Sequence, residues 1–187
     1  MSAASYALAA DVRAGSVTGG TVDCFPTGAL TAVLNERGMS VEAAAPADAL
    51  PGGGVRFDKV SGSMSSTFQG KLDMEGGISL VGKDGTRLDV LNPSGETPLG
   101  ALSATPQTTR PGQTPQTGTR AEVAYPLVPG SVSGRPTSLT TFEVTVGSTN
   151  FALKEAGAAR INDAFGTTLA KDATFMKCTA VLQGRLG

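Results

Sequence analysis

A stretch of alternating apolar and polar residues between Gly52 and Leu91 constrains the fold more than any other part of the sequence. A period of two places one face of a segment on a core and the other in water, as in antiparallel sheets. Asp84-Gly85 adds a hairpin signal, because glycine tolerates the positive φ that a tight turn requires. The alternating apolar positions are Val55 and Phe57, Phe68, Leu72 and Met74, Ile78 and Leu80, and Leu88 and Val90. This stretch therefore predicts a β-meander.

The composition extends this prediction to the whole chain. Among 187 residues there are 25 glycines and 11 prolines, with only 5% aromatic and 17% charged residues. Frequent glycine and proline turns are typical of all-β proteins. We therefore expect a single domain over residues 1–187, an antiparallel β-sandwich or partly open barrel of about eight to ten strands. Residues 4–13 are its first expected strand, and residues 139–146 and 175–182 are two of its later ones.

One short helix is predicted near the C-terminus. Leu153, Ile161 and Phe165 share a face at helical spacing, and Gly166 is placed to end the helix in the left-handed conformation. Gly157 inside the helix costs about 1 kcal/mol relative to alanine, which indicates a close approach to the sheet. Residues 29–34 fit either a strand or a turn of helix.

The chain contains no histidine. This excludes Ser-His and Cys-His catalysis and every metal site that needs imidazole. An enzyme would have to use a carboxylate pair, a Ser-Lys dyad or a metal with oxygen ligands, so we expect a non-catalytic protein without a metal site. A net charge of −1 argues against nucleic-acid binding. No apolar run approaches the roughly 18 residues that span a membrane.

Cys24 and Cys178 lie near opposite ends of the chain. They are either two buried free thiols or a disulfide that joins the N-terminal strand to the C-terminal one, and we favour the disulfide. Such a bridge implies an oxidising compartment, so we expect an extracellular or cell-surface location. The first residues lack the basic and apolar regions of a signal peptide. Either the protein is cytoplasmic, or its signal peptide was removed or replaced by Met1, and we favour the second interpretation.

Residues 103–120 differ in composition from the rest of the chain. They contain three prolines, six threonines and three glutamines, and only one apolar side chain, Ala104. Such a segment buries too little to hold itself in place. We predict a mobile loop, or alternatively an arm that becomes ordered on a neighbouring subunit.

The last sixty residues resemble the closing segment of HtaA-type domains of actinobacterial secreted proteins, in which a strand leads into a short helix and then a final strand. The matching residues are Leu153, Gly157, Ala158, Asn162 and Gly166. A middle section is also similar to that family, at Gly54, Val55, Phe57, Gly70, Leu72, Gly76, Gly77, Ile78 and Leu80.

The resemblance implies a binding module, since the haem-uptake members of this family hold haem with tyrosine and histidine side chains. Met74 stands at the position of the family's histidine, and Tyr6 and Tyr125 are the only tyrosines. A thioether can ligate haem iron, but captured ferric haem is usually held by a harder donor. We therefore expect haem, if bound at all, to be bound weakly.

These features lead to one main functional prediction and one alternative. The main prediction is a secreted or surface-exposed, non-catalytic module that binds a ligand or another protein. The alternative is a self-assembling structural subunit of a surface filament or a phage virion, whose partners are copies of itself. An enzyme that uses carboxylates only is the third candidate.

Overall fold

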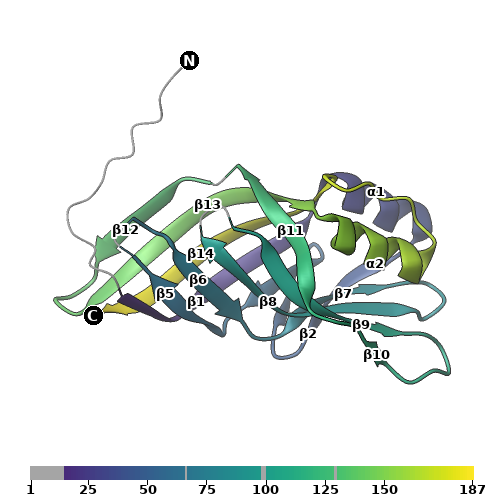
Figure 1. Ribbon diagram of the computed structural model, residues 1–187, viewed down its shortest axis with the longest axis horizontal. Helices are drawn as coiled ribbons and strands as arrows, with labels where there is room; N and C mark the ends of the chain where they lie inside the picture. Colours follow the sequence, from purple (N-terminus) through teal and green to yellow (C-terminus); the bar gives the residue numbers. More distant parts are fainter. Residues whose placement is uncertain (1–14, 66, 98–99, 129) are drawn as a thin grey trace, which may run out of the picture.

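The computed structural model describes residues 15–65, 67–97, 100–128 and 130–187, in which eight antiparallel strands close into a barrel. The alternating runs and glycine turns of the sequence therefore form a closed barrel, and the predicted all-β class is confirmed (Figure 1). In order around the barrel, the strands are β1 (Gly15–Pro26), β5 (Val60–Met64), β6 (Gly70–Met74), β8 (Arg87–Thr97), β9 (Leu102–Thr109), β11 (Ala121–Val128), β13 (Thr141–Leu153) and β14 (Thr174–Leu186).

Short outer strands extend this barrel and bring the sheet to 14 strands, more than the eight to ten predicted. Several are only two to five residues long, too short for a clear alternating pattern. The outer strands pair as follows: β2 (Ser40–Ala44) with β7 (Gly77–Val81), β7 with β8, β3 (Asp48–Leu50) with β4 (Gly54–Phe57), β4 with β1, β10 (Gln116–Thr117) with β9, and β12 (Val132–Pro136) with β13.

The predicted hairpin is present between β7 and β8, but the predicted meander is wrong, because β6 pairs with β8 rather than with β7, and β4 pairs with β3 and β1 rather than with β5. Gly85 has a φ of 85° in the turn between β7 and β8. Asn92 has a φ of 48° and lies at a β-bulge, where β8 ends its pairing with β7 and begins its pairing with β6. The Asn92 N–H donates to the Gly76 carbonyl oxygen (2.6 Å), which fixes this change of partner. A single long strand thus belongs to both the barrel and the outer sheet.

The C-terminal helix α2 (Glu155–Phe165) forms as predicted. Gly166 follows it with a φ of 62° and ends it in the left-handed conformation. A Cβ atom at Gly157 would overlap the carbonyl oxygen of Val123 in β11, so the helix approaches the sheet as closely as the sequence indicated. Because Gly157 has no side chain, the helix can pack this close to the barrel.

A second helix, α1 (Gly28–Arg37), replaces the undecided segment 29–34. Its apolar residues are spread around the helix rather than along one stripe, which is why periodicity did not identify it. Leu30 and Leu34 are nevertheless buried, and Gly38 ends the helix with a φ of 58°. Both helices lie at the same end of the barrel, away from β12 and the C-terminus (Figure 1).

The loop predicted for residues 103–120 is wrong for its first part. Residues 103–109 belong to β9, which pairs with β8 on one side and β11 on the other. The prediction failed because a barrel strand needs backbone partners rather than many apolar side chains, and Ala104 and Pro106 suffice for the inner face. Residues 116–117 form β10, and the turn between β9 and β10 is exposed. The first predicted strand, residues 4–13, lies outside the described residues.

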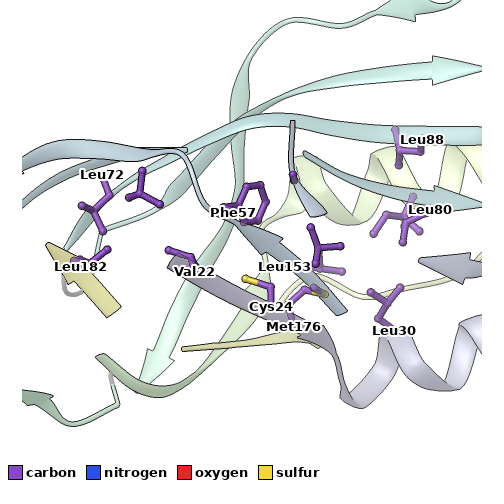
Figure 2. Close-up of a cluster of buried hydrophobic side chains, with 14 of the residues drawn as sticks. Val22, Cys24, Leu30, Phe57, Leu72, Leu80, Leu88, Leu153, Met176 and Leu182 are labelled. Atoms are coloured by element: carbon purple, nitrogen blue, oxygen red, sulfur yellow. The ribbon is translucent and has the colours of Figure 1, made fainter. Parts of the chain in front are cut away.

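The hydrophobic core fills the barrel and continues under the helices. Cys24, Leu153 and Met176 point toward one another, and Leu30 of α1 lies beside them (Figure 2). Phe57 from β4 is 1% exposed and extends the same cluster. The outer strand β4 therefore contributes to the core although it is not part of the barrel ring.

Candidate functional site

Two adjoining cavities lie among the apolar side chains of the interior. The strand-side cavity has a volume of about 120 Å³ and is lined by residues of β5, β6, β8, β13 and β14, including Met64, Leu72 and Val146. The helix-side cavity has a volume of about 110 Å³ and reaches α1 and α2 at Leu30 and Ile161. Both linings are predominantly apolar. Such spaces favour apolar ligands, because a dry cavity offers a water molecule few partners.

The two cavities share a common wall in the middle of the barrel. Five residues line both of them: Val22, Met74, Leu102, Phe151 and Cys178. Of these, Met74 has the most flexible side chain, with an unbranched thioether that adapts to irregular space.

Cys24 and Cys178 form a disulfide in the same wall. They are directly opposite each other in the pairing of β1 with β14. The bridge between the two terminal strands is therefore present as predicted, and Cys24 is 5% exposed. Cys178 lines both cavities, and Cys24 lines the helix-side cavity.

The structure does not bring the tyrosine and methionine candidates together. Tyr125 of β11 donates its hydroxyl to Asp172 Oδ1 (2.9 Å) at the protein surface and lines neither cavity. This hydrogen bond, followed by desolvation and the Asp172 charge, raises the pKa of Tyr125 above its usual value. Met74 faces the interior instead, and Tyr6 lies outside the described residues.

The two cavities are too small for haem. An apolar cavity of about 150 Å³ accommodates benzene, and each of these cavities is smaller, whereas a haem macrocycle is several times larger than benzene. The Met74 thioether is the one side chain that reaches both cavities and is known as a haem-iron ligand. The Tyr125 hydroxyl is engaged by Asp172 outside them.

The neighbouring carboxylates are paired with cations. Asp73 forms an ion pair with Lys71 (3.0 Å), and Glu75 lies 3.9 Å from Lys59. Within the described ranges, no group of three or more Cys, Asp or Glu side chains is arranged to hold a metal ion. The described helices include none that is long and apolar enough to cross a membrane. The carboxylates of this strand therefore act as partners for lysines.

Sequence reasoning named Met74, Cys24 and Cys178 but not the rest of the cavity lining. Val22, Leu102 and Phe151 carry no chemical signal in the sequence, since they are ordinary apolar residues at inward positions of strands. Only the closure of the barrel shows that they enclose space rather than fill it.

No family model matches the sequence, and no curated protein matches it. Solved structures do match. The C-terminal domain of HtaA from Corynebacterium glutamicum aligns over 90% of this chain and 99% of its own, with a TM-score of 0.62 and 16% identity. The domain-swapped dimer of its H434A variant aligns over 86% and 94%, with a TM-score of 0.56 and 16% identity.

The heme binding protein HtaB from the same organism also aligns, over 92% of this chain and 96% of its own, with a TM-score of 0.52 and 15% identity. This chain therefore has an HtaA-like fold, as the motifs of its middle and last strands indicated. At such identities the similarity shows the fold alone, and any function has to be inferred from the side chains of this barrel.

Proposed function

We propose that this chain, with its HtaA-like fold, is a non-catalytic module that acts outside the cytoplasm and holds a small apolar ligand inside its barrel. The observation that carries the proposal is the pair of adjoining apolar cavities with Met74 in their common wall. The similarity to HtaB, which is described as a heme binding protein, supports a binding role for the fold. We propose a ligand other than haem, because the two cavities and the donors that the described residues offer do not suit haem.

The size of the cavities limits the ligand to a slender molecule. Each takes a group no larger than a small ring, and together they suit a chain of several methylene groups. Burial stabilises each methylene by about 0.8 kcal/mol, so the affinity should increase with each methylene group that enters the cavities. A broad, rigid ligand would require the strands themselves to move apart.

The disulfide supports a location outside the cytoplasm. Both cysteines of the chain are joined between paired strands, and such bridges persist in oxidising compartments.

Methionine methyl groups provide a direct test. Met64, Met74 and Met176 line the cavities, whereas Met39 lines neither of them. In a protein labelled with ¹³C at the methionine methyls, octan-1-ol should shift the resonances of the three lining residues and leave that of Met39 unchanged. Unchanged spectra up to the solubility limit of octan-1-ol would reject the proposal.

A pair of adjacent substitutions gives the matched control. Ala180 lines the strand-side cavity, and Val181 is the next residue on β14 and is exposed on the outside. Ala180→Phe should fill the cavity and weaken binding of octan-1-ol, while Val181→Phe should not. Thermal melting of both variants verifies that the barrel is intact.

Self-assembly is a second candidate, and one edge of the sheet favours it. Among the described strands, β12 pairs only with β13, and it is flanked by Val128 (72% exposed) and Leu139 (98% exposed). An edge strand with exposed apolar neighbours can pair with another copy of the chain. Light scattering after size-exclusion chromatography tests this: a monomer at all concentrations argues against assembly.

A further inference from the structure

The helix-side cavity adjoins a polar pocket, and two residues line both spaces. Pro106 of β9 and Arg160 of α2 line both the cavity and this neighbouring pocket, which has a volume of about 330 Å³. The polar pocket lies between the β9–β10 hairpin and α2, and its polar lining includes Arg110, Gln116, Thr117 and Asp163. An apolar space and a polar space thus share Arg160 as part of their walls.

Arg160 is exposed and has no charged partner among the described residues. To the residues that the structure describes, its side chain donates no hydrogen bond and forms no ion pair. Its Nη2 atom lies 3.3 Å from the position that a Cβ atom at Gly118 would occupy, so the missing side chain of Gly118 leaves room for the guanidinium. An arginine at the boundary of an apolar cavity with unused donors is suited to bind an anion.

The surrounding charges favour an anion as well. Arg110 donates through Nη2 to the main-chain carbonyl oxygen of Asp163 (3.2 Å) and is not paired with the Asp163 carboxylate. Two arginines therefore face one carboxylate in the polar pocket, which leaves a net positive charge there.

We infer that the ligand is a short-chain amphiphile whose anionic headgroup binds Arg160, with Arg110 nearby, and whose apolar chain enters the helix-side cavity. This inference rests on the proposed function and specifies its ligand class. A headgroup cannot follow the chain inward, because an unpaired charge is strongly disfavoured in an apolar interior. The chain cannot remain outside without losing the stabilisation that burial of methylene groups provides. At Arg160, the headgroup of one ligand molecule can contact the guanidinium while its apolar chain occupies the helix-side cavity.

The test compares two probes with the same chain. Octanoate and octan-1-ol differ in the headgroup, so a guanidinium at the cavity mouth should favour octanoate. Calorimetry or methionine-methyl titration should show that Arg160→Gln weakens octanoate binding by about tenfold, the effect of one charged hydrogen bond, and leaves octan-1-ol unchanged. Arg185→Gln, on the exposed outer face of β14, is the matched control and should change neither affinity.

A measurement on the unmodified protein keeps the test independent of how the variant folds. Raising the salt concentration from 0.05 to 0.5 M should weaken octanoate binding and not that of octan-1-ol, because salt screens the partly exposed ion pair. Equal affinities for the two probes, unchanged by salt and by Arg160→Gln, would overturn this inference and leave the apolar site intact. Absence of binding by both probes would overturn the proposed function together with it.

Discussion

Cys24 of β1 and Cys178 of β14 are opposite residues of one antiparallel pair, and a disulfide joins them within the wall between the two cavities. The two strands are the first and the last of the described chain, so the bridge joins the two ends of the barrel's sequence. It also lies in the lining of both cavities through Cys178. The stability of the fold and the shape of the interior therefore depend on the same pair of residues.

Removal of this bridge should destabilise the protein strongly. For a sequence separation of 154 residues, the chain-entropy relation gives about 5 kcal/mol, and measured disulfides typically contribute about 2–4 kcal/mol. In urea unfolding, the double variant Cys24→Ala/Cys178→Ala should therefore have a free energy of unfolding about 2–5 kcal/mol lower than that of the unmodified protein. Alkylation of the unreduced native protein is the control, since any reactive thiol would contradict the bridge.

The pairing of Tyr125 with Asp172 predicts a pH effect that can be observed directly. The hydrogen bond and the nearby charge raise the pKa of the phenol in the folded state. Its stabilising contribution should be complete below about pH 10, the unfolded value, and be lost as the pH rises through the higher folded pKa. Absorbance at 295 nm of a Tyr6→Phe variant, in which Tyr125 is the only tyrosine, should give a midpoint above 10.

Substitutions at Asp172 separate the causes of this shift. Asp172 has a φ of 67°, which both glycine and asparagine tolerate. Asp172→Asn keeps an acceptor for the Tyr125 hydroxyl and should retain part of the shift, whereas Asp172→Gly should return the midpoint toward 10. Identical midpoints for all three proteins would disprove the pairing.

The contact between Gly157 and Val123 predicts an inverted response to alanine. Alanine normally stabilises a helix relative to glycine by about 1 kcal/mol. At Gly157 the added Cβ would overlap the Val123 carbonyl oxygen, so Gly157→Ala should instead lower the free energy of unfolding by about 1–3 kcal/mol. Gly19→Ala, at a position with no atom within 4 Å of the added Cβ, is the control and should be close to neutral.

The regular parts of the fold could be predicted because they repeat a local pattern. Alternation predicted the strands around Leu72 and Leu80, though not their order in the sheet, and helical spacing with Gly166 predicted α2. Helix α1 was not predicted because its burial by β14 and the barrel is a tertiary effect without an amphipathic stripe. Strand β9 was not predicted because the hydrogen bonds on its two sides come from distant strands.

Polar side chains show the same limit. Arg87 donates to Asp89 (2.7 Å), to Ser79 (2.6 Å) and to Glu42 (2.8 Å), and so joins β8, β7 and β2. Ser79 is fully buried, although its sequence context indicates a solvent-facing position. The register of three strands creates this network, and the register follows from the fold rather than from any local motif. The junction at Arg160 was missed for the same reason.

Haem provides a test of the cavity argument. Hemin added to the purified protein should give the broad, shifted Soret band of nonspecific association, without a stoichiometric end point. Met74→Leu keeps the apolar wall and removes the thioether, so it should leave the hemin spectrum unchanged. A sharp ferric complex at micromolar protein that is lost in Met74→Leu would show that the methionine ligates iron.

The hydrogen bonds of Arg120 predict how the segment 103–120 responds to trypsin. The composition predicted a mobile segment that is cut first after Arg120, since the Arg110–Pro111 bond resists trypsin. In the structure, the Arg120 guanidinium donates to the carbonyl oxygens of Asn92 (2.9 Å) and Ser103 (3.0 Å) and also contacts Ser94. We therefore expect slow cleavage at this bond in the folded protein.

Arg120→Lys gives the comparison that decides between these expectations. Lysine remains a trypsin site but lacks the planar, multidentate donor of arginine, so it cannot hold all three partners together. The variant should be cut several times faster than the unmodified protein, as followed by intact mass during limited digestion. If both proteins are cut rapidly and equally at residue 120, the hydrogen bonds do not hold the segment, and the mobility predicted from its composition is the better description.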